Sequence, residues 1–216
     1  MHMMNTNKIE IPNLYMLKND DREKLVKTYM SAFRKYPKLM NAFPDEDTRM
    51  AALEATLRYY TAYDLTYGSG FSLDENINEA VLLAHSDRMK YTFFKHLRAG
   101  SYSKGYRSAM NRLTKEERKI RVSLFEELDR LEATVDIPSP HIYVDFLGVN
   151  EAFQHQGRGR RLMTNVCSYA DSVRLPLMLF TNTADDVRFY QSLGFKIIGE
   201  TSSKKFGFTN TYLIYE

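Results

Sequence analysis

The chain has 216 residues, of which 44% are hydrophobic, enough for one domain with its own core. Its 30 basic and 27 acidic residues leave a net charge of +3, too small to indicate a nucleic-acid partner by itself. No apolar run approaches the ~18 residues of a membrane span, and the N-terminus lacks the apolar core of a signal peptide. The single cysteine, Cys167, excludes an intramolecular disulfide and suits a reducing compartment. We therefore expect one cytoplasmic domain over residues 1–216.

The N-terminal part of the chain carries two helical patterns between extended segments. In each helical segment apolar residues recur at spacings of three and four, which is typical of a helix with one buried face. Asp20 and Glu23 resemble a capping box at the start of the first helix, and Gly68 and Gly70 end the second. The helices are expected at about 20–33 and 47–63 with a loop at Pro37 and Pro44, and the strands at 13–18, 70–73 and 79–85, the last two as an antiparallel hairpin.

Residues 87–140 form a segment without a strand pattern and with room for two helices. One helix is predicted for 88–99, and the residues from Gly100 to Gly105 follow it as a flexible break. A stronger pattern covers 115–134, where the apolar stripe consists of Ile120, Leu124, Leu128 and Leu131. This helical insertion either borders a binding cleft or simply covers one face of the sheet.

The last third of the chain has the order strand, helix, strand. Two strands joined by a helix in this way run parallel, with a right-handed crossover. A final pair of strands is expected to close the sheet in antiparallel fashion. The strands are predicted at 141–149, 175–182, 195–201 and 211–216, and the helices at about 158–172 and 184–193. The fold class is therefore a mixed α/β sheet.

The junction after the strand at 141–149 is a candidate anion site. Gly157 and Gly159 suit a turn in which backbone approaches a ligand closely, and the helix that follows directs unpaired N–H groups at the same point. Arg158, Arg160 and Arg161 add positive charge. The pattern lacks the lysine of a phosphate-binding P-loop and the third glycine of a dinucleotide fold.

The same junction resembles motif A of the GNAT superfamily of N-acetyltransferases, [QR]-x-x-G-x-[GA] after a strand that ends in Val. The matching residues are Gln154, Gly157 and Gly159, with Val149 at the end of the strand. In that family the turn holds the pyrophosphate of acetyl-CoA, and backbone groups of the preceding strand contact the pantetheine arm and the thioester carbonyl. The resemblance implies a cofactor site made of Leu147, Gly148, Val149, Gln154, His155, Gln156, Gly157, Arg158, Gly159, Arg160 and Asn182.

A second string resembles motif B of the superfamily, at the expected distance from motif A. It contains Phe189-Tyr190 and ends in Gly194-Phe195. In the family this tyrosine protonates the departing CoA sulfur, so the resemblance makes Tyr190 the general acid. Two departures stand out: Glu151 replaces a common proline, and the asparagine expected seven residues before the tyrosine is displaced by one, to Asn182.

The strand at 141–149 offers candidates for the catalytic base. Strict alternation places Ile142, Val144 and Phe146 on a core face and His141, Tyr143 and Asp145 on the opposite face, toward the cleft. Asp145 is the main candidate, acting directly or through water. It is alternatively a counter-charge for the substrate ammonium or a purely structural partner of a basic residue. His141 is the alternative base.

Other nucleophiles and metals find little support. Cys167 follows the apolar stripe of its helix and is expected to be a small buried residue rather than an acyl carrier. The five histidines are scattered, so no metal site is expected.

The resemblance implies a GNAT fold with antiparallel N-terminal strands, a central β-α-β unit whose parallel strands splay apart, and an insertion at 87–140. It implies direct transfer of the acetyl group of acetyl-CoA to a primary amine, for which a small molecule is favoured over a histone-like tail. Since members of the superfamily often dimerise, a homodimer is a candidate assembly. The rival interpretations are a non-catalytic acyl-CoA-binding sensor or scaffold and a nucleotide-binding βαβ protein.

Overall fold

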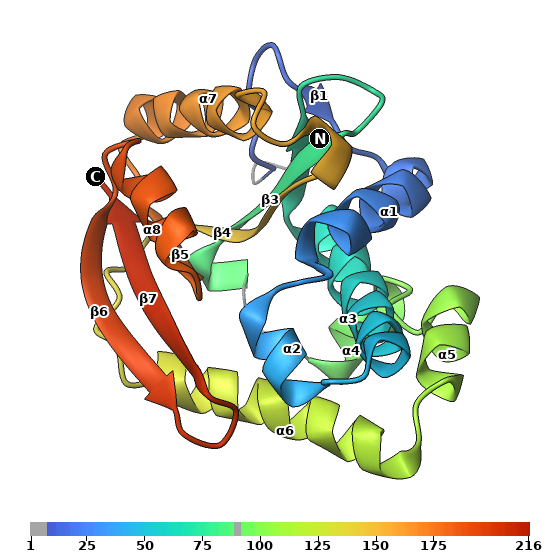
Figure 1. Cartoon of the computed structure of the whole chain (residues 1–216). Helices are drawn as coiled ribbons and strands as arrows, with labels where there is room; N and C mark the ends of the chain where they lie inside the picture. Colours follow the sequence, from blue (N-terminus) through green and yellow to red (C-terminus); the bar gives the residue numbers. More distant parts are fainter. Residues whose placement is uncertain (1–7, 89–91) are drawn as a thin grey trace.

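One seven-stranded mixed sheet with helices on both faces forms the framework of the protein in a computed structural model that describes residues 8–88 and 92–216 (Figure 1). Among the paired strands, only β4 and β5 run parallel within these residues. The spatial order is β1 (Tyr15–Met16), β2 (Ser69–Ser72), β3 (Glu79–His85), β4 (Ile142–Val149), β5 (Leu177–Thr181), β7 (Phe208–Tyr215) and β6 (Lys196–Ser203). The predicted strands, the hairpin and the C-terminal antiparallel pair are confirmed; β1, β4 and β5 are shorter than predicted, and β6 and β7 are longer.

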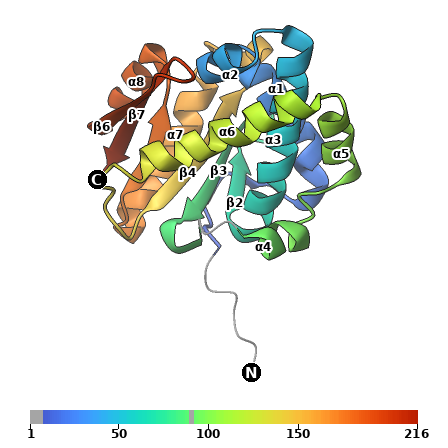
Figure 2. The same cartoon turned by 90° about the horizontal axis from the view of Figure 1, so that it is seen from below.

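The helices divide between the two faces of the sheet. On one face lie α1 (Arg22–Phe33), α2 (Pro37–Ala42), α3 (Glu46–Tyr67) and α6 (Lys115–Glu132), and on the other α7 (Arg158–Val173) and α8 (Ala184–Gln191). Figure 2 shows α6 in front of the sheet and α7 behind it. The remaining two, α4 (Phe93–Arg98) and α5 (Lys104–Asn111), lie beside α3.

Local sequence explains several helix boundaries, and the structure corrects two of the boundaries that we expected. Asp45 caps α3 by accepting from Thr48 N–H at 2.9 Å. Pro37 was predicted to lie in a loop but is the first residue of α2, where its missing N–H costs no helical hydrogen bond. The break predicted from Gly100 to Gly105 is too long, because α5 already begins at Lys104. The segment 87–140 thus holds three helices rather than two; of the helix predicted at 88–99, residues 89–91 lie outside the described part.

Helix α6 connects the two halves of the molecule along one face. At its N-terminal end Glu117 accepts a hydrogen bond from Thr48 of α3 at 3.0 Å. Farther along, Ser123 accepts from Lys205 in the β6–β7 turn, and at its end Glu132 accepts from Tyr143 of β4 at 3.5 Å. The predicted apolar stripe packs into the core at Leu124, Leu128 and Leu131, whereas Ile120 is 37% exposed.

A β-bulge in β4 overturns the strict alternation that the sequence predicted. The register against β3 shifts so that Leu83 pairs with Val144 and Leu82 with Phe146, which makes Asp145 the additional residue. Ile142 and Val144 therefore pack under α7 as predicted. Phe146 lies on the opposite face, stacked on Tyr29 of α1 with ring centroids 5.6 Å apart, and was assigned to the wrong side.

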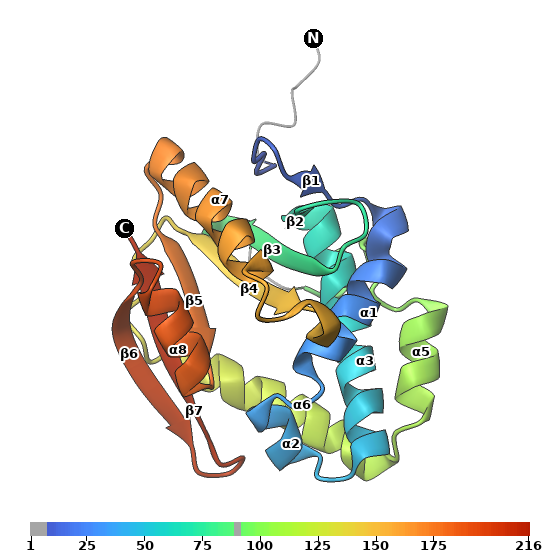
Figure 3. The same cartoon turned by 45° about the horizontal axis from the view of Figure 1, so that its top comes forward.

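Beyond the first two residues of β4, the parallel strands separate. Their pairing consists of Ile142 with Leu177 and Tyr143 with Met178. From there β4 continues beside β3 while β5 continues beside β7, and Figure 3 shows the two strands pointing apart. The splay that the family resemblance implied is thus present, and it opens on the side of Asp145.

Gly148 allows α1 to pack closely against β4 next to this opening. A Cβ atom there would lie 2.7 Å from a ring carbon of Tyr29, which is fully buried and cannot move aside. We expect Gly148→Ala to destabilise the protein by roughly 1–3 kcal/mol through overpacking. Urea unfolding followed by circular dichroism measures the change, with Ser168→Ala on the exposed side of α7 as the control. Equal stability of the two variants would contradict the close packing.

Candidate functional site

The turn between β4 and α7 presents backbone N–H groups without partners at one point. Gly157 precedes the helix with φ of 73°, in the left-handed region that glycine tolerates, and His155 also has a positive φ of 59°. The N–H groups of residues 151–154 are bonded within the protein, and the next bonded one is that of Arg161, which donates to Gly157 C=O at 2.9 Å. Among the described residues, the N–H groups of 155–160 have no such partner and are therefore free to bind an anion, helped by the helix dipole.

Most side chains of this turn bond back to the protein. The Gln154 amide donates to Val149 C=O at 3.0 Å, and the Gln156 amide donates to Ala152 C=O at 3.2 Å. Arg160 donates to the Ser192 hydroxyl at 2.7 Å. Gln156 and Arg160 therefore offer the expected cofactor their backbone N–H groups rather than their side chains, whereas the backbone N–H of Gln154 already donates to Glu151 C=O at 3.3 Å.

A cavity of about 400 Å³ adjoins the turn on the outer side of α7. The exposed side chain of Arg161 contributes a positive charge to this cavity. The lining residues are Gly157, Arg160, Arg161, Thr164 and Asn165. Gly159 lies behind the turn, where a Cβ atom would come within 3.3 Å of Val149 Cγ2, so its role is close packing of helix on strand.

The end of β4 directs backbone groups into the opening. Asn150 N–H donates to Asn78 C=O on the β3 side at 2.8 Å. Because successive strand residues point their N–H groups to opposite sides, Val149 and Leu147 point theirs away from β3, where β5 has already diverged. Gly148 lies between them against α1. This placement agrees with the contacts predicted for Leu147 and Val149.

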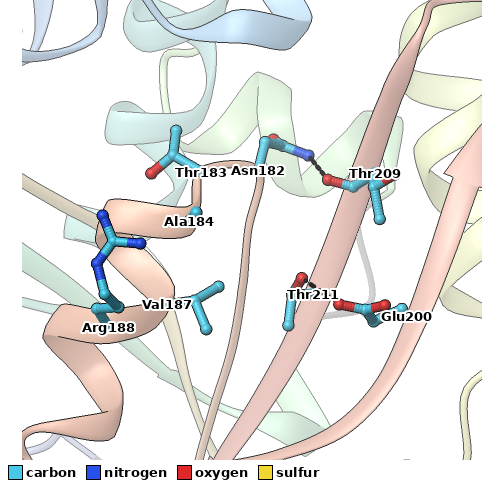
Figure 4. A pocket seen from close by; sticks show the side chains of 8 residues that line it. All are labelled: Asn182, Thr183, Ala184, Val187, Arg188, Glu200, Thr209 and Thr211. Carbon is cyan, nitrogen blue, oxygen red and sulfur yellow. Dashed lines mark hydrogen bonds between the residues drawn. The ribbon is translucent and has the colours of Figure 1, made fainter.

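Asn182 is turned away from the opening. Its side-chain amide donates to Thr209 C=O of β7 at 2.9 Å, and β7 pairs with β5 on the edge opposite β4 (Figure 4). Its backbone N–H donates to the Tyr36 hydroxyl at 3.1 Å. The cavity of about 380 Å³ that it lines with α8, β6 and β7 is accordingly a separate one. The predicted cofactor contact of the Asn182 side chain gains no support from this orientation.

Tyr190 lies in α8 with only 8% of its surface exposed. Phe189 and Phe195 contact its ring, with centroids 5.1 and 5.3 Å away. Burial raises the pKa of the Tyr190 hydroxyl well above its usual value, and Asp186 and Tyr36 add to the effect. The hydroxyl therefore holds its proton throughout the neutral range, as a general acid must.

Asp145 lies beside a second carboxyl group, that of Asp64 in α3. Asp64 is 1% exposed. Burial, the charge of Asp145 and a hydrogen bond to Asp145 raise the pKa of Asp64 well above its usual range. Asp64 is therefore the protonated member of the pair at neutral pH.

Two further charged groups surround this pair. Glu132 of α6 has its pKa raised to about 7 by burial and by the charge of Asp145. Lys38 of α2 has its pKa lowered to about 8 by burial, against the opposing effect of Asp145 and Glu132, and its Nζ lies 4.8 Å from the centre of the Phe180 ring. Tyr29 lies between Tyr190 and the two aspartates. Burial raises the pKa of its hydroxyl well above the usual value, and Asp64, Asp145 and Tyr190 raise it further.

His141 stands apart from these groups. It directly precedes β4, at the end where β4 and β5 are still paired and away from the opening between them. Its Nδ1 lies 2.6 Å from Pro138 C=O, and burial lowers its pKa. The structure therefore brings Asp145 to the opening but leaves His141 at the opposite end of the strand, which weakens its case as the alternative base. Tyr143, predicted to face the cleft, is buried beside Met178 and Tyr212.

A family model described as acetyltransferase (GNAT) domain matches residues 120–197, which include most of α6, the turn between β4 and α7, and Tyr190. This part of the chain is similar to the GNAT acetyltransferase domain. A search among curated proteins finds no match.

Solved structures with the GNAT fold match over nearly the whole chain. A structure described as histone acetyltransferase HPA2 and related acetyltransferase, from Corynebacterium glutamicum ATCC 13032, has a TM-score of 0.59 at 16% identity, with 95% of this chain and 96% of that chain covered. Arylalkylamine N-acetyltransferase 2 from Aedes aegypti has a TM-score of 0.57 at 12% identity, with coverages of 94% and 97%. An agmatine N-acetyltransferase variant has a TM-score of 0.53 at 14% identity, with 94% of this chain and 98% of that chain covered. At these identities the likeness is one of fold.

Sequence reasoning missed the charged groups that the helices contribute to this site. Asp64 could have been recognised from the sequence, because it follows Leu57 and Tyr60 at helical spacing and so places a carboxyl group on an apolar stripe. Lys38 and Glu132 could not, since each lies in a stretch rich in charges or at a helix end.

Metal and membrane features complete the description. Within 8–88 and 92–216, no three His, Cys, Asp or Glu side chains are grouped so as to hold a metal ion. The helices of the same residues include none that is both long and apolar enough to cross a membrane.

The thiol of Cys167 is expected to be inert in the folded protein. It is 6% exposed, and burial raises its pKa to about 12, so that almost no thiolate forms below pH 9. Ellman's reagent should give no signal with the native protein at pH 8 and one thiol equivalent per chain after unfolding in guanidinium. Rapid labelling of the native protein would contradict this and make Cys167 a candidate acyl carrier.

Proposed function

We propose that this protein is an N-acetyltransferase that moves the acetyl group of acetyl-CoA directly to the primary amine of a small molecule. One observation carries the proposal: β4 and β5 part after Tyr143, and the opening has an anion-binding turn at one end and an acidic group at the other. A pantetheine arm needs such a passage, and an amine needs such a base. Two of the neighbouring structures are named for amine acceptors, agmatine and arylalkylamine, which is consistent with this substrate class.

On the donor side, the backbone N–H groups that precede Arg161 bind the pyrophosphate. The N–H groups of Leu147 and Val149 face the pantetheine and the thioester. An N–H group directed at the carbonyl oxygen stabilises the negative charge that develops there as the amine attacks.

On the acceptor side, the amine must lose its proton, because a free alkylammonium has a pKa of about 10.4. Asp145, beside the protonated Asp64, accepts it directly or through water. Glu132 lies nearby and adds negative charge, which attracts a cationic amine and disfavours an acidic acceptor. The reaction then ends with collapse of the tetrahedral intermediate and departure of the CoA thiolate, to which Tyr190 donates its proton.

Removal of the Tyr190 hydroxyl tests the role of the general acid. We expect Tyr190→Phe to lower kcat by about 10²–10⁴-fold and to leave CoA binding nearly unchanged, because only the proton donor is lost. The release of CoA thiol during turnover with a panel of amines measures the first quantity, and calorimetric titration with CoA measures the second.

Two comparisons sharpen that experiment. Tyr215→Phe removes a hydroxyl that bonds to Asp171 at the far end of β7 and should leave turnover unaffected. Tyr36→Phe removes the hydroxyl of a second tyrosine near Tyr190; burial raises the pKa of Tyr36 to about 12. Loss of turnover in Tyr36→Phe together with full activity in Tyr190→Phe would transfer the role to Tyr36. Binding of CoA without turnover of any amine in the native protein would favour a sensor or scaffold instead.

The Asp64–Asp145 pair predicts a shift in pH dependence. In Asp64→Asn an amide replaces the protonated carboxyl group, and because the amide is the weaker hydrogen-bond donor, Asp145 ionises less readily. The acidic limb of kcat/KM should therefore move to higher pH, while Asp145→Asn should lower kcat at every pH. Glu116→Gln, an exposed acid of α6, serves as the control. If Asp145→Asn raises KM for the amine and spares kcat, Asp145 binds the ammonium group and is not the base.

A further inference from the structure

The guanidinium of Arg158 points away from the anion-binding turn to which the residue belongs. Arg158 is the first residue of α7, yet its side chain is 19% exposed and engaged on two sides. Its Nη2 donates to Asp74 at 2.8 Å, and its Nε forms an ion pair with Glu79. Both partners belong to the β2–β3 hairpin, so Arg158 joins this hairpin to the turn.

Glu79 is a fixed anchor for that connection. It is 0% exposed and lies opposite Val149, the last residue of β4 before the turn. Its other oxygen accepts hydrogen bonds from the Ser72 hydroxyl at 3.0 Å and from Leu73 N–H at 2.9 Å. A buried carboxylate needs a compensating cation, and Arg158 is the one that the structure provides.

The turn itself needs such an anchor. His155 and Gly157 both have positive φ, a conformation that an L-residue such as His155 adopts only when its surroundings hold it. Asp74 is held as well, because it also accepts a hydrogen bond from Asn76 N–H at 2.9 Å. The N–H groups of the turn thus keep their direction through a chain of contacts from the hairpin to the first residue of α7.

We propose that Arg158 is a positioning residue for donor binding: with Glu79 and Asp74 it fixes the turn that binds the diphosphate of acetyl-CoA, and its own guanidinium does not contact that diphosphate. This inference rests on the proposed function for the identity of the ligand. It changes the role assigned to Arg158 from a phosphate ligand to a support of the backbone N–H groups that are the ligands. The hairpin at 69–85, distant from the turn in sequence, then becomes a determinant of CoA affinity.

The test uses two donors that share the acetylated pantetheine arm. Acetyl-CoA carries in addition the diphosphate with its 3′-phosphoadenosine, whereas S-acetylpantetheine lacks both and depends on the β4–β5 opening alone. Glu79→Gln, Arg158→Gln and the double variant are compared with the native protein, with Arg130→Gln, which removes an exposed ion pair on α6, as the control. For each, calorimetry gives the Kd of CoA, and thiol release gives kcat/KM for both donors. The double variant leaves no unpaired buried charge and so remains folded where a single variant does not.

We expect all three variants to weaken CoA binding and kcat/KM for acetyl-CoA by about tenfold, the loss of roughly one charge-assisted interaction, and to leave kcat/KM for S-acetylpantetheine within about twofold. A Glu79→Gln variant that binds CoA normally or more tightly, beside an Arg158→Gln variant that binds it weakly, would make Arg158 a phosphate ligand and overturn the proposal. An equal loss with both donors would reduce the ion pair to general stability and also overturn it. The Kd values decide the matter even if no amine is acetylated, an outcome that would count against the proposed function alone.

Discussion

The additional residue in β4 is the constraint on which the rest of the site depends. A continuous parallel pair would have satisfied the backbone of β4 and β5 along their length and left no passage between them. The bulge at Asp145 instead bends β4 toward α1, so that pairing with β5 ends at Tyr143. The N–H groups of Leu147 and Val149 become available, and the side chain of Asp145 comes to lie beside Asp64.

The parts of this molecule that sequence reasoning predicted are those encoded by short-range patterns. The turn at Gly157 and the helix that carries Tyr190 follow from residue spacing over a dozen positions, and both are where the resemblance placed them. The stripe through Leu124 and Leu128 likewise identified α6 and its buried side. In each of these the local preference and the tertiary environment agree.

The errors arose where tertiary contacts decide the outcome. Strict alternation assigned Phe146 to the wrong face, since nothing in the composition of β4 marks an inserted residue; the register against β3 imposes it. The ion pair of Arg158 was equally out of reach of sequence reasoning, because its partner Glu79 lies 79 positions away. The carboxyl pair depends on α3 meeting β4, and only the folded chain brings Asp64 to Asp145.

Helix α6 gives this fold a property that its strands alone would lack. It spans the divide between the half of the sheet that contains β3 and β4 and the half that contains β6 and β7, and it delivers Glu132 to the acidic group at the opening (Figure 1). A change in the length or tilt of this one helix would alter at once how far apart the halves stand and which charges an incoming amine meets. If the opening admits an amine as proposed, α6 couples passage width to acceptor selectivity, and relatives with a different segment between β3 and β4 should differ in both.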